Sequence, residues 1–321
     1  MNIAILGCGR WASFHAWYQS KVLGNSTLVW GLDSPMYRDL SKTHKNEYLK
    51  LPKDVKFTSD LKVALDFADY VIISISAQAM PEFSANIAKL NPENKTFILC
   101  MKGVIDATGD RLTEVLSREV DKSNKIAIWV GPGHVQELVK GQPNIMLIDS
   151  RDPEITHDII EKFKSKLIRF YHGDDLVGAE IGAAAKNVIG IIAGILDGAN
   201  LTSLKGALMA RGIYEVARLI VAMGGKTLTA YGISHLGDFQ ATLFSENSHN
   251  RSYGEKLYKG EREEHLAEGV ATSKALELLA KKYKVEMPIC HLCYQICYEG
   301  KDVDQGFHEL FERDNVKEFR F

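Results

Sequence analysis

The sequence predicts an α/β protein in two parts, a mostly parallel sheet flanked by helices and then an all-helical carboxyl-terminal part. The 321 residues are enough for roughly two domains, each with its own core. Strand-like runs alternate with helical stretches up to residue 173, and only helical segments follow. The composition, 45% hydrophobic and 25% charged, is that of an ordinary folded protein.

The predicted strands are eight short runs rich in apolar and β-branched residues. Helical stretches separate most of them, which is the pattern of parallel strands joined by crossover helices. The runs cover residues 2–6, 27–30, 55–57, 70–75, 96–100, 125–130, 145–148 and 167–171.

The predicted helices of the second part are amphipathic or rich in small residues, and they cover residues 178–195, 203–223, 269–283 and 288–298. The junction is expected at residues 172–175, which gives a domain over 1–173 and a second over 174–321. Because nothing between them resembles a flexible linker, close packing of the two domains is expected.

Charge and hydrophobicity narrow the class of protein. A formal net charge of −2 argues against nucleic-acid binding through a basic surface. Met1 leads directly into a strand-like run, so no signal peptide is expected. The most apolar helical stretch, residues 187–196, is shorter than the ~20 residues that cross a bilayer, so no transmembrane segment is predicted. Five cysteines, an odd number, favour reduced thiols in a cytoplasmic protein.

Three cysteines and a histidine near the carboxyl terminus raise the question of zinc. Cys290, Cys293 and Cys297 are spaced i, i+3 and i+7, which places them along one face of a predicted helix, with His291 beside them. Buried cysteine on such a face behaves as a small apolar residue. Structural zinc sites usually draw on separated pairs of ligands, so the interpretation favours packing and predicts no metal.

The first chemical motif is the glycine-rich segment 7–12, between the first predicted strand and a helical stretch. Gly7 permits a tight turn, Gly9 lets a pyrophosphate approach the backbone, and Ala12 is small enough for the helix to pack on the strand. The phosphates of a dinucleotide then meet amide groups at the start of a helix. This is a Rossmann-type dinucleotide-binding pattern.

The second predicted strand is followed by Asp33, 26 residues after Gly7. A carboxylate there accepts hydrogen bonds from the adenosine ribose and repels a 2′-phosphate. The next basic residue along the chain is Arg38, so NAD(H) is favoured over NADP(H). The alternative is that Asp33 only turns the chain before Pro35.

Polar residues follow two further strands and interrupt an apolar helix. Lys102 follows the strand at 96–100, and residues 131–134 follow the strand at 125–130, so both lie at the sheet edge where ligands bind and predict a cleft. Lys186 and Asn187 interrupt the helix at 178–195. A buried lysine is costly unless it is paired, and burial favours its use as a proton donor.

These motifs together resemble the bacterial NAD(P)-dependent glycerol-3-phosphate dehydrogenase family over nearly the whole chain. The resemblance implies an amino-terminal Rossmann domain, a helical carboxyl-terminal domain, and reversible reduction of dihydroxyacetone phosphate to sn-glycerol 3-phosphate for glycerophospholipid synthesis. The motifs that carry it are Gly7-x-Gly9-x-Trp11, Lys102-Gly103, Gly131-Pro132, Glu180-x5-Lys186-Asn187, Arg211-Gly212, Met223-Gly224-Gly225, Leu236-Gly237-Asp238 and Glu268-Gly269-Val270.

The resemblance also implies roles for individual residues. Lys186 is expected to be the catalytic acid and base, Lys102 to contact substrate and cofactor, and Asp238 to bind substrate and keep the lysines charged. The implied substrate-binding set is Lys102, Gly131, Gly133, Asp238, Ser248, His249, Asn250 and Arg251. The implied cofactor-binding set is Gly7, Gly9, Arg10, Trp11, Ala12, Asp33, Lys102, Val135, His249 and Glu268, although Glu268 also suits the start of a helix.

The chain departs from the family at three places. His249 stands where the family typically has an arginine between Ser248 and Asn250, and an imidazole does not replace a permanently charged planar fork. Either Arg251 or a protonated His249 is expected to meet the substrate phosphate. Gly133 and His134 replace Ser-Phe, and Leu32 replaces a basic residue, which again favours NAD(H).

Three functions remain open from the sequence. The first is the glycerol-3-phosphate dehydrogenase. The second is a related 3-hydroxyacid-type dehydrogenase, and the third is a dinucleotide-binding regulatory protein that has lost turnover through the change at His249. The expected ligands are small molecules rather than nucleic acid. The apolar faces of the helical half suit either a homodimer or the domain's own core.

Overall fold

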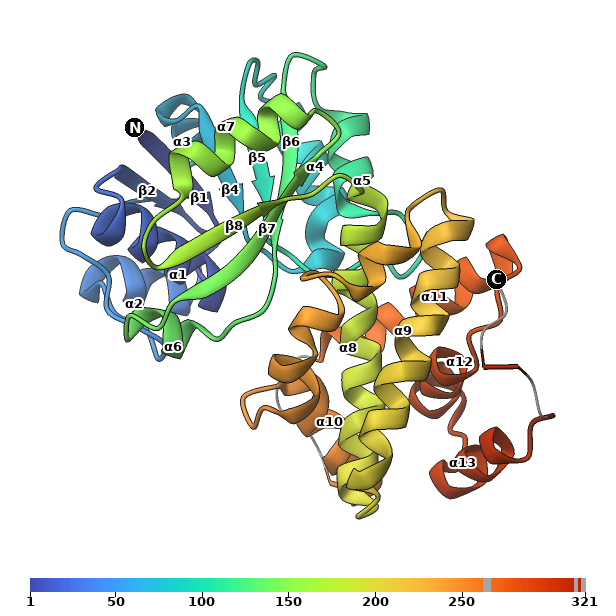
Figure 1. The fold of residues 1–321 in the computed structure, drawn as a ribbon. Helices are drawn as coiled ribbons and strands as arrows, with labels where there is room; N and C mark the ends of the chain where they lie inside the picture. The colour runs from blue at the N-terminus through green and yellow to red at the C-terminus, as the bar shows by residue number, and fades with distance from the viewer. Residues whose placement is uncertain (262–266, 315–316, 319–321) are drawn as a thin grey trace. The chain divides into compact units, whose positions relative to one another are not determined.

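The computed structural model describes residues 1–261, 267–314 and 317–318 and forms two compact units (Figure 1). The first unit contains residues 1–102 and 112–174, and the second contains residues 103–111 and 175–321. The short segment 103–111, which the sequence assigns to the first part, therefore belongs to the helical unit. Val104 lies in that unit's core, and Arg111 forms a buried ion pair with Glu180 at 2.6 Å.

The first unit is built on one eight-stranded sheet in the order β3-β2-β1-β4-β5-β6-β7-β8. All pairs are parallel except β6 with β7, so the predicted mostly parallel sheet is confirmed. The strands are β1 (Asn2–Leu6), β2 (Ser26–Trp30), β3 (Lys56–Thr58), β4 (Tyr70–Ile73), β5 (Thr96–Leu99), β6 (Lys125–Val130), β7 (Asn144–Ser150) and β8 (Ile168–His172).

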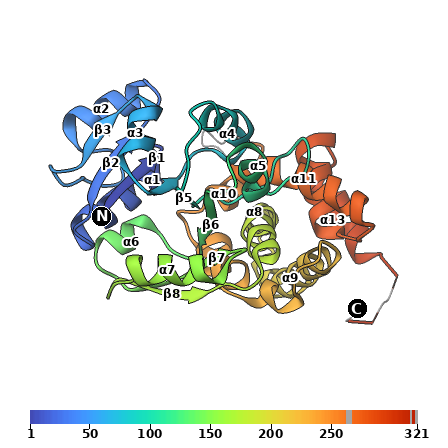
Figure 2. The ribbon, with the colours of Figure 1, turned by 90° about the horizontal axis from the view of Figure 1, so that it is seen from above.

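Helices cover both faces of this sheet because its central strands are apolar on both sides. Figure 2 shows α4 and α5 together on one side and α6 with α7 on the other. Helix α1 packs on the side of α7, since Tyr18, just beyond its end, donates a 2.7 Å hydrogen bond to the Phe163 carbonyl. These helices are α1 (Arg10–Trp17), α2 (Pro35–Thr43), α3 (Leu61–Phe67), α4 (Met80–Ala88), α5 (Leu112–Glu119), α6 (Val135–Val139) and α7 (Pro153–Phe163).

Apart from an isolated β-bridge between Val104 and Arg111, the described residues of the second unit form helices and turns, and the predicted all-helical part is confirmed. Its centre is α8, with α9, α10, α11 and α12 packed around it (Figure 1). Each of the four predicted helices is present, although the last one changes to a π-helical turn at Gln295–Glu299. The helices are α8 (Leu176–Gly198), α9 (Lys205–Ala222), α10 (His249–Tyr258), α11 (Glu268–Tyr283), α12 (Pro288–Tyr294) and α13 (Val303–Phe311).

Helix α8 corrects the prediction of a short apolar stretch at 187–196. It has 23 residues, and by length and composition it is the one helix of the described chain that can span a bilayer. Its apolar stretch is nevertheless completely buried in the unit, which is the environment of a core helix. Lys186 and Asn187 therefore lie within a buried helix.

Glycines let α10 pack directly against α8. A Cβ at Gly194 would collide with the Arg251 carbonyl oxygen, and a Cβ at Gly254 would collide with the Ile191 carbonyl oxygen. The two backbones are in contact because neither glycine has a side chain. This contact fixes the segment 248–251 beside α8.

Candidate active site

The turn between β1 and α1 has the geometry expected of a dinucleotide-binding motif. Gly7 has φ +131° and donates a backbone hydrogen bond of 2.9 Å to the Trp30 carbonyl. A Cβ at Gly7 would collide with the Ser74 carbonyl and lie 3.4 Å from Ala12 Cβ, so both positions require small residues. Gly9 precedes α1, and a Cβ there would meet no atom within 4 Å. The open side of Gly9 provides room for a phosphate.

Lys102 links three of the predicted site segments within the first unit. Its Nζ donates a 2.8 Å hydrogen bond to the Gly131 carbonyl and lies 5.8 Å from the centre of the Trp11 ring. Both interactions keep the ammonium at the carboxyl ends of β5 and β6, next to the glycine turn. Arg10 points elsewhere, because its guanidinium stacks 4.8 Å from the Tyr48 ring centre.

The loop after β6 depends on glycine. Gly131 and Gly133 have φ +146° and +132°, values that other residues rarely adopt. A Cβ at Gly133 would also collide with the Asn144 side chain. His134 then precedes α6, and Val135 at the start of that helix is buried in the core of the unit. The structure thus gives Val135 a packing role.

Asp33 is exposed after β2, but it is not isolated from positive charge. Ser34 and Pro35 begin α2, which returns the chain, and Arg38 Nε lies 2.8 Å from Asp33 Oδ1. The two side chains are 68% and 66% exposed. Arg38 is five residues beyond Asp33 in the sequence, but its side chain reaches back to Asp33, so an acid and an exposed cation lie together after β2. Leu32, 72% exposed, supplies no charge.

Lys186 lies at the centre of a buried polar cluster in the helical unit. Its Nζ donates a 2.6 Å hydrogen bond to Thr242 Oγ1 and forms an ion pair with Asp238 Oδ2 at 3.2 Å. The Lys186 and Asp238 side chains are only 8% and 2% exposed. Thr242 in turn donates to the Asp238 carbonyl at 2.8 Å. A buried ammonium held in this way is the arrangement expected of a positioned proton donor.

Sequence reasoning missed Thr242 and His235, which lie on either side of Asp238 along the chain. The spacing of four between Asp238 and Thr242 is the one signal that points to Thr242, since residues four apart share a helical face. A single histidine in a turn carries no such signal. His235 is nevertheless completely buried, and its Nδ1 lies 2.8 Å from the Gly182 carbonyl.

The segment 248–251 is positioned by its own hydrogen bonds. Ser248 caps α10, since its Oγ accepts from the Arg251 backbone N–H at 3.3 Å. Asn250 Oδ1 accepts from the Gly269 N–H at 2.8 Å, and a Cβ at Gly269 would lie 2.6 Å from the Asn187 carbonyl. Asn250 therefore connects the start of α11, where Glu268 is half-buried, to the part of α8 next to Lys186.

Arg251 has contacts that do not suit the predicted phosphate ligand. Its Nη1 lies 2.6 Å from Asp197 Oδ2 and 3.3 Å from Glu255 Oε2, and its Nε donates to the Ser245 carbonyl. Asp197 is eleven residues beyond Lys186 on α8, which corresponds to about 16 Å along a helix. His249 is half-buried at the first position of α10.

The described residues include no group of three or more His, Cys, Asp and Glu side chains arranged to hold a metal. Cys290 and Cys293 are buried in the core around α8, and burial raises the pKa of Cys290 well above the ordinary value. Cys297 packs against the same core. All five cysteines are free thiols.

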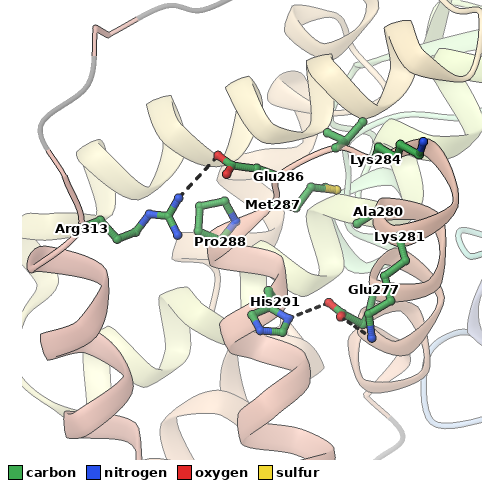
Figure 3. Close-up of a pocket in the computed structure, with 10 residues that line it drawn as sticks. Glu277, Ala280, Lys281, Lys284, Glu286, Met287, Pro288, His291 and Arg313 are labelled. Carbon is green, nitrogen blue, oxygen red and sulfur yellow. Dashed lines mark hydrogen bonds and ion pairs between the residues drawn. The ribbon is translucent and has the colours of Figure 1, made fainter.

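The helical unit also has a cavity of about 340 Å³ between α11 and the start of α12 (Figure 3). It is lined by a hydrogen bond of 2.7 Å between His291 Nδ1 and Glu277 Oε2 and by an ion pair of 3.6 Å between Arg313 and Glu286. None of the predicted site residues lines this cavity. It is therefore separate from the Lys186 cluster.

Both parts of the chain match models of one protein family. Residues 2–156 match the model of the NAD-dependent glycerol-3-phosphate dehydrogenase N-terminus, and residues 175–308 match that of its C-terminus. A glycerol-3-phosphate dehydrogenase [NAD(P)+] of Fusobacterium nucleatum is 31% identical over 100% of this chain and 99% of its own length. The Macrococcus caseolyticus protein of the same name is 33% identical, over 99% of this chain and 100% of its own length.

Solved structures give the same relationship. The glycerol-3-phosphate dehydrogenase of Coxiella burnetii is similar with a TM-score of 0.90 and 28% identity, over 97% of this chain and 99% of that one. A D-mandelate dehydrogenase shares the fold, with a TM-score of 0.66 and 16% identity. The similarity covers 93% of this chain and 97% of that one. With two relatives above 30% identity along the full length, this chain belongs to the NAD-dependent glycerol-3-phosphate dehydrogenase family.

Proposed function

We propose that this NAD(P)-dependent glycerol-3-phosphate dehydrogenase uses Lys186 as the proton donor and acceptor when it interconverts dihydroxyacetone phosphate and sn-glycerol 3-phosphate. The observation that carries the proposal is the buried contact of Lys186 Nζ with Asp238 and Thr242. Side chains on neighbouring segments hold the ammonium in one place, as proton transfer to a defined atom requires.

The chemistry explains why a lysine suits this position. When bound, the nicotinamide cofactor exchanges a hydride with C2 of the substrate. Lys186 stabilises the negative charge that develops on the C2 oxygen and then protonates that oxygen. In the reverse direction, neutral Lys186 accepts the hydroxyl proton. Asp238 keeps the ammonium charged between turnovers, and Thr242 orients it.

The first unit supplies the cofactor site in this proposal. The pyrophosphate of the cofactor meets the amides after Gly9, where the backbone has open space. Trp11 and Lys102 lie beside that turn, and Lys102 adds positive charge toward substrate and cofactor. Gly131, on the loop after β6, accepts the Lys102 hydrogen bond with its carbonyl oxygen.

Asp33 and Arg38 together decide the choice of cofactor. We propose that Asp33 accepts from the adenosine ribose hydroxyls, so NADH is preferred. Arg38 forms only an exposed ion pair with Asp33, and such pairs are weak enough to rearrange. Arg38 is therefore able to turn toward a 2′-phosphate, which makes NADPH a usable second cofactor.

The substrate phosphate is proposed to contact the start of α10. His249 and Asn250 lie on the segment that is held against α8 near Asn187, whereas the Arg251 side chain is paired with Asp197 and Glu255. The protein is proposed to act in the cytoplasm and to supply glycerol 3-phosphate for glycerophospholipids, without nucleic-acid partners.

The test compares two buried lysines of the helical unit. Lys186→Met is expected to abolish oxidation of NADH by dihydroxyacetone phosphate while NADH binding stays within a few fold. Lys205→Met is the matched control, because Lys205 is equally buried and ion-paired, with Asp197 at 2.6 Å, but lies outside the proposed site. The control is expected to lose stability and keep its kcat. Full turnover in Lys186→Met contradicts the proposed role of Lys186.

The two other functions are distinguished by the same assay. Turnover of a 3-hydroxyacid or its keto acid, with none of dihydroxyacetone phosphate, supports the related dehydrogenase. Binding of NADH without turnover of any keto phosphate or keto acid supports a regulatory protein.

A further inference from the structure

His235 is a completely buried imidazole beside the turn of α8 that carries Lys186. Its Nδ1 lies 2.8 Å from the Gly182 carbonyl oxygen, and its Cβ would be 2.9 Å from a Cβ at Gly182. Gly182 therefore has to be glycine for His235 to fit. Gly182 is also four residues before Lys186, so in the α-helix its carbonyl accepts the Lys186 backbone N–H. One carbonyl oxygen thus binds both residues.

The hydrogen bond fixes the protonation state of the ring. A carbonyl oxygen only accepts, so Nδ1 carries the hydrogen and Nε2 carries a lone pair. Burial lowers the pKa of His235 to about 4; the charge of Lys186 also lowers it, while the Gly182 hydrogen bond and the charge of Asp238 raise it. The Phe239 ring packs edge-on against the imidazole, with 4.7 Å between the two ring centres. The imidazole is therefore neutral at neutral pH.

Packing alone does not explain a histidine here. Nε2 is buried and has no hydrogen-bond partner among the described residues, which is a cost that an apolar side chain of similar shape avoids. Residues that break a local packing rule in this way are concentrated at functional sites. The charges that act on the ring are those of Lys186 and Asp238, which the proposed reaction uses.

We propose that His235 is a positioning residue for Lys186: its Nδ1–H anchors the Gly182 carbonyl, and its ring supports the lysine stem in the conformation that reaches Asp238 and Thr242. Side chains on a helix lean toward the preceding turn, so the stem of Lys186 extends over the turn that begins at Gly182. Gly182 has no side chain to support the stem, and His235 occupies that place. This inference rests on the proposed role of Lys186.

The test separates the hydrogen bond from the volume of the ring. His235→Leu keeps most of the volume and loses the donor, whereas the amide nitrogen in His235→Asn stands close to where Nδ1 was. We expect His235→Leu to lower kcat roughly 10- to 100-fold, with the KM for NADH within about twofold, because small displacements of a catalytic group have effects of this size. His235→Asn is expected to recover most of the loss.

Two readouts distinguish positioning from a general loss of folded protein. In His235→Leu the primary isotope effect with 4-deuterated NADH should rise and the pH profile of kcat should move, because proton and hydride transfer become limiting. Leu292→Ala, a core substitution in the same unit, should lower stability and change neither readout.

A His235→Leu enzyme with normal kcat, or with both readouts unchanged, overturns the inference, as does equal loss in His235→Asn and His235→Leu. These outcomes leave the proposed function intact as long as Lys186→Met is inactive. If Lys186→Met turns over normally, the proposed function itself fails.

Discussion

Lys186 and Asp238 form an ion pair that is almost completely removed from solvent, with 3.2 Å between Nζ and Oδ2. Breaking such a pair leaves an uncompensated buried charge, which typically costs about 3–5 kcal/mol. Asp238→Asn is therefore expected to lower the free energy of unfolding by that order and kcat by at least about 100-fold.

The pH profile of kcat for Asp238→Asn tests whether Asp238 stabilises the charged form of Lys186. Without the carboxylate, Lys186 loses its proton more easily, so the basic limb of the kcat profile for carbonyl reduction should move to lower pH. Asp197→Asn is the control, since it breaks a similar pair with Lys205 outside the proposed site. An unchanged basic limb in Asp238→Asn contradicts the role of the ion pair.

The two glycines of the β1–α1 turn predict opposite outcomes for the same substitution. Gly7→Ala has to place a Cβ against the Ser74 carbonyl at φ +131°, so it should destabilise the first unit. A Cβ at Gly9 meets no atom within 4 Å, so the Tm of Gly9→Ala should stay within about 2 °C of the wild type. Its Kd for NADH should rise about tenfold, because the methyl group takes the space of the pyrophosphate. Calorimetry and NADH titration measure both. Normal NADH binding by Gly9→Ala argues against phosphate binding there.

The segment 248–251 predicts a division of roles between neighbouring residues. Arg251→Met breaks contacts to Asp197 and Glu255, so it should lower the Tm while the KM for dihydroxyacetone phosphate stays within about twofold. His249→Ala should raise that KM about tenfold with little change in Tm, because a contact to a phosphate is lost. A large rise in KM for Arg251→Met reverses the assignment.

The sequence predicted all eight strands mainly because most of them are short apolar runs; β3 is the exception, since only Phe57 in it is apolar. The order of the strands and the antiparallel pairing of β7 depend on non-local contacts, and no local pattern encodes them. Helix α10 was missed for a related reason. Its sequence has little apolar periodicity, and it packs on α8 through backbone contacts at Gly194 and Gly254 that only the fold reveals.

The candidate site divides in the same way. The glycine turn, Lys102 and Lys186 could be predicted, because their chemistry requires particular residue types at the ends of strands or within an apolar helix. The proximity of Arg38 to Asp33 depends on the turn at Ser34, and the contact of His235 with Gly182 joins residues 53 positions apart. Neither relationship has a signal in the local sequence.

Cofactor choice follows from the exposed pair of Asp33 and Arg38. Asp33→Asn removes the carboxylate that repels a 2′-phosphate, so the ratio of kcat/KM for NADPH to that for NADH should rise by roughly tenfold. Arg38→Ala should reduce the same ratio by a similar factor, since an arginine contact to phosphate is lost, and leave NADH within about twofold. Steady-state kinetics with both cofactors test this. If Arg38→Ala leaves the NADPH value unchanged, Arg38 does not read the 2′-phosphate.

Glu215 provides a test of the helical unit that is independent of catalysis. Its carboxylate is buried and accepts hydrogen bonds from the backbone N–H groups of Ile289, at 2.9 and 3.1 Å, and Cys290, at 3.2 Å, at the start of α12. Burial raises its pKa from 4.5 to about 7, although these N–H groups and Arg218 oppose the rise. The folded protein therefore holds a proton here that the unfolded chain releases above pH 4.5.

Because of this difference in proton binding, the free energy of unfolding falls as pH rises from 4.5 to about 7. The stabilisation from the Glu215 proton is complete below pH 4.5 and lost by about pH 7, and it amounts to about 3 kcal/mol at most. Glu215→Gln is neutral throughout and keeps an oxygen acceptor, so relative to the wild type it should gain stability between pH 5 and pH 8 in urea unfolding. Glu309→Gln is the control, because Lys301 lowers the pKa of exposed Glu309. The difference in unfolding free energy between Glu309→Gln and the wild type should therefore not change with pH above about pH 5. A flat difference for Glu215→Gln as well would show that Glu215 is already ionised in the folded protein at pH 5.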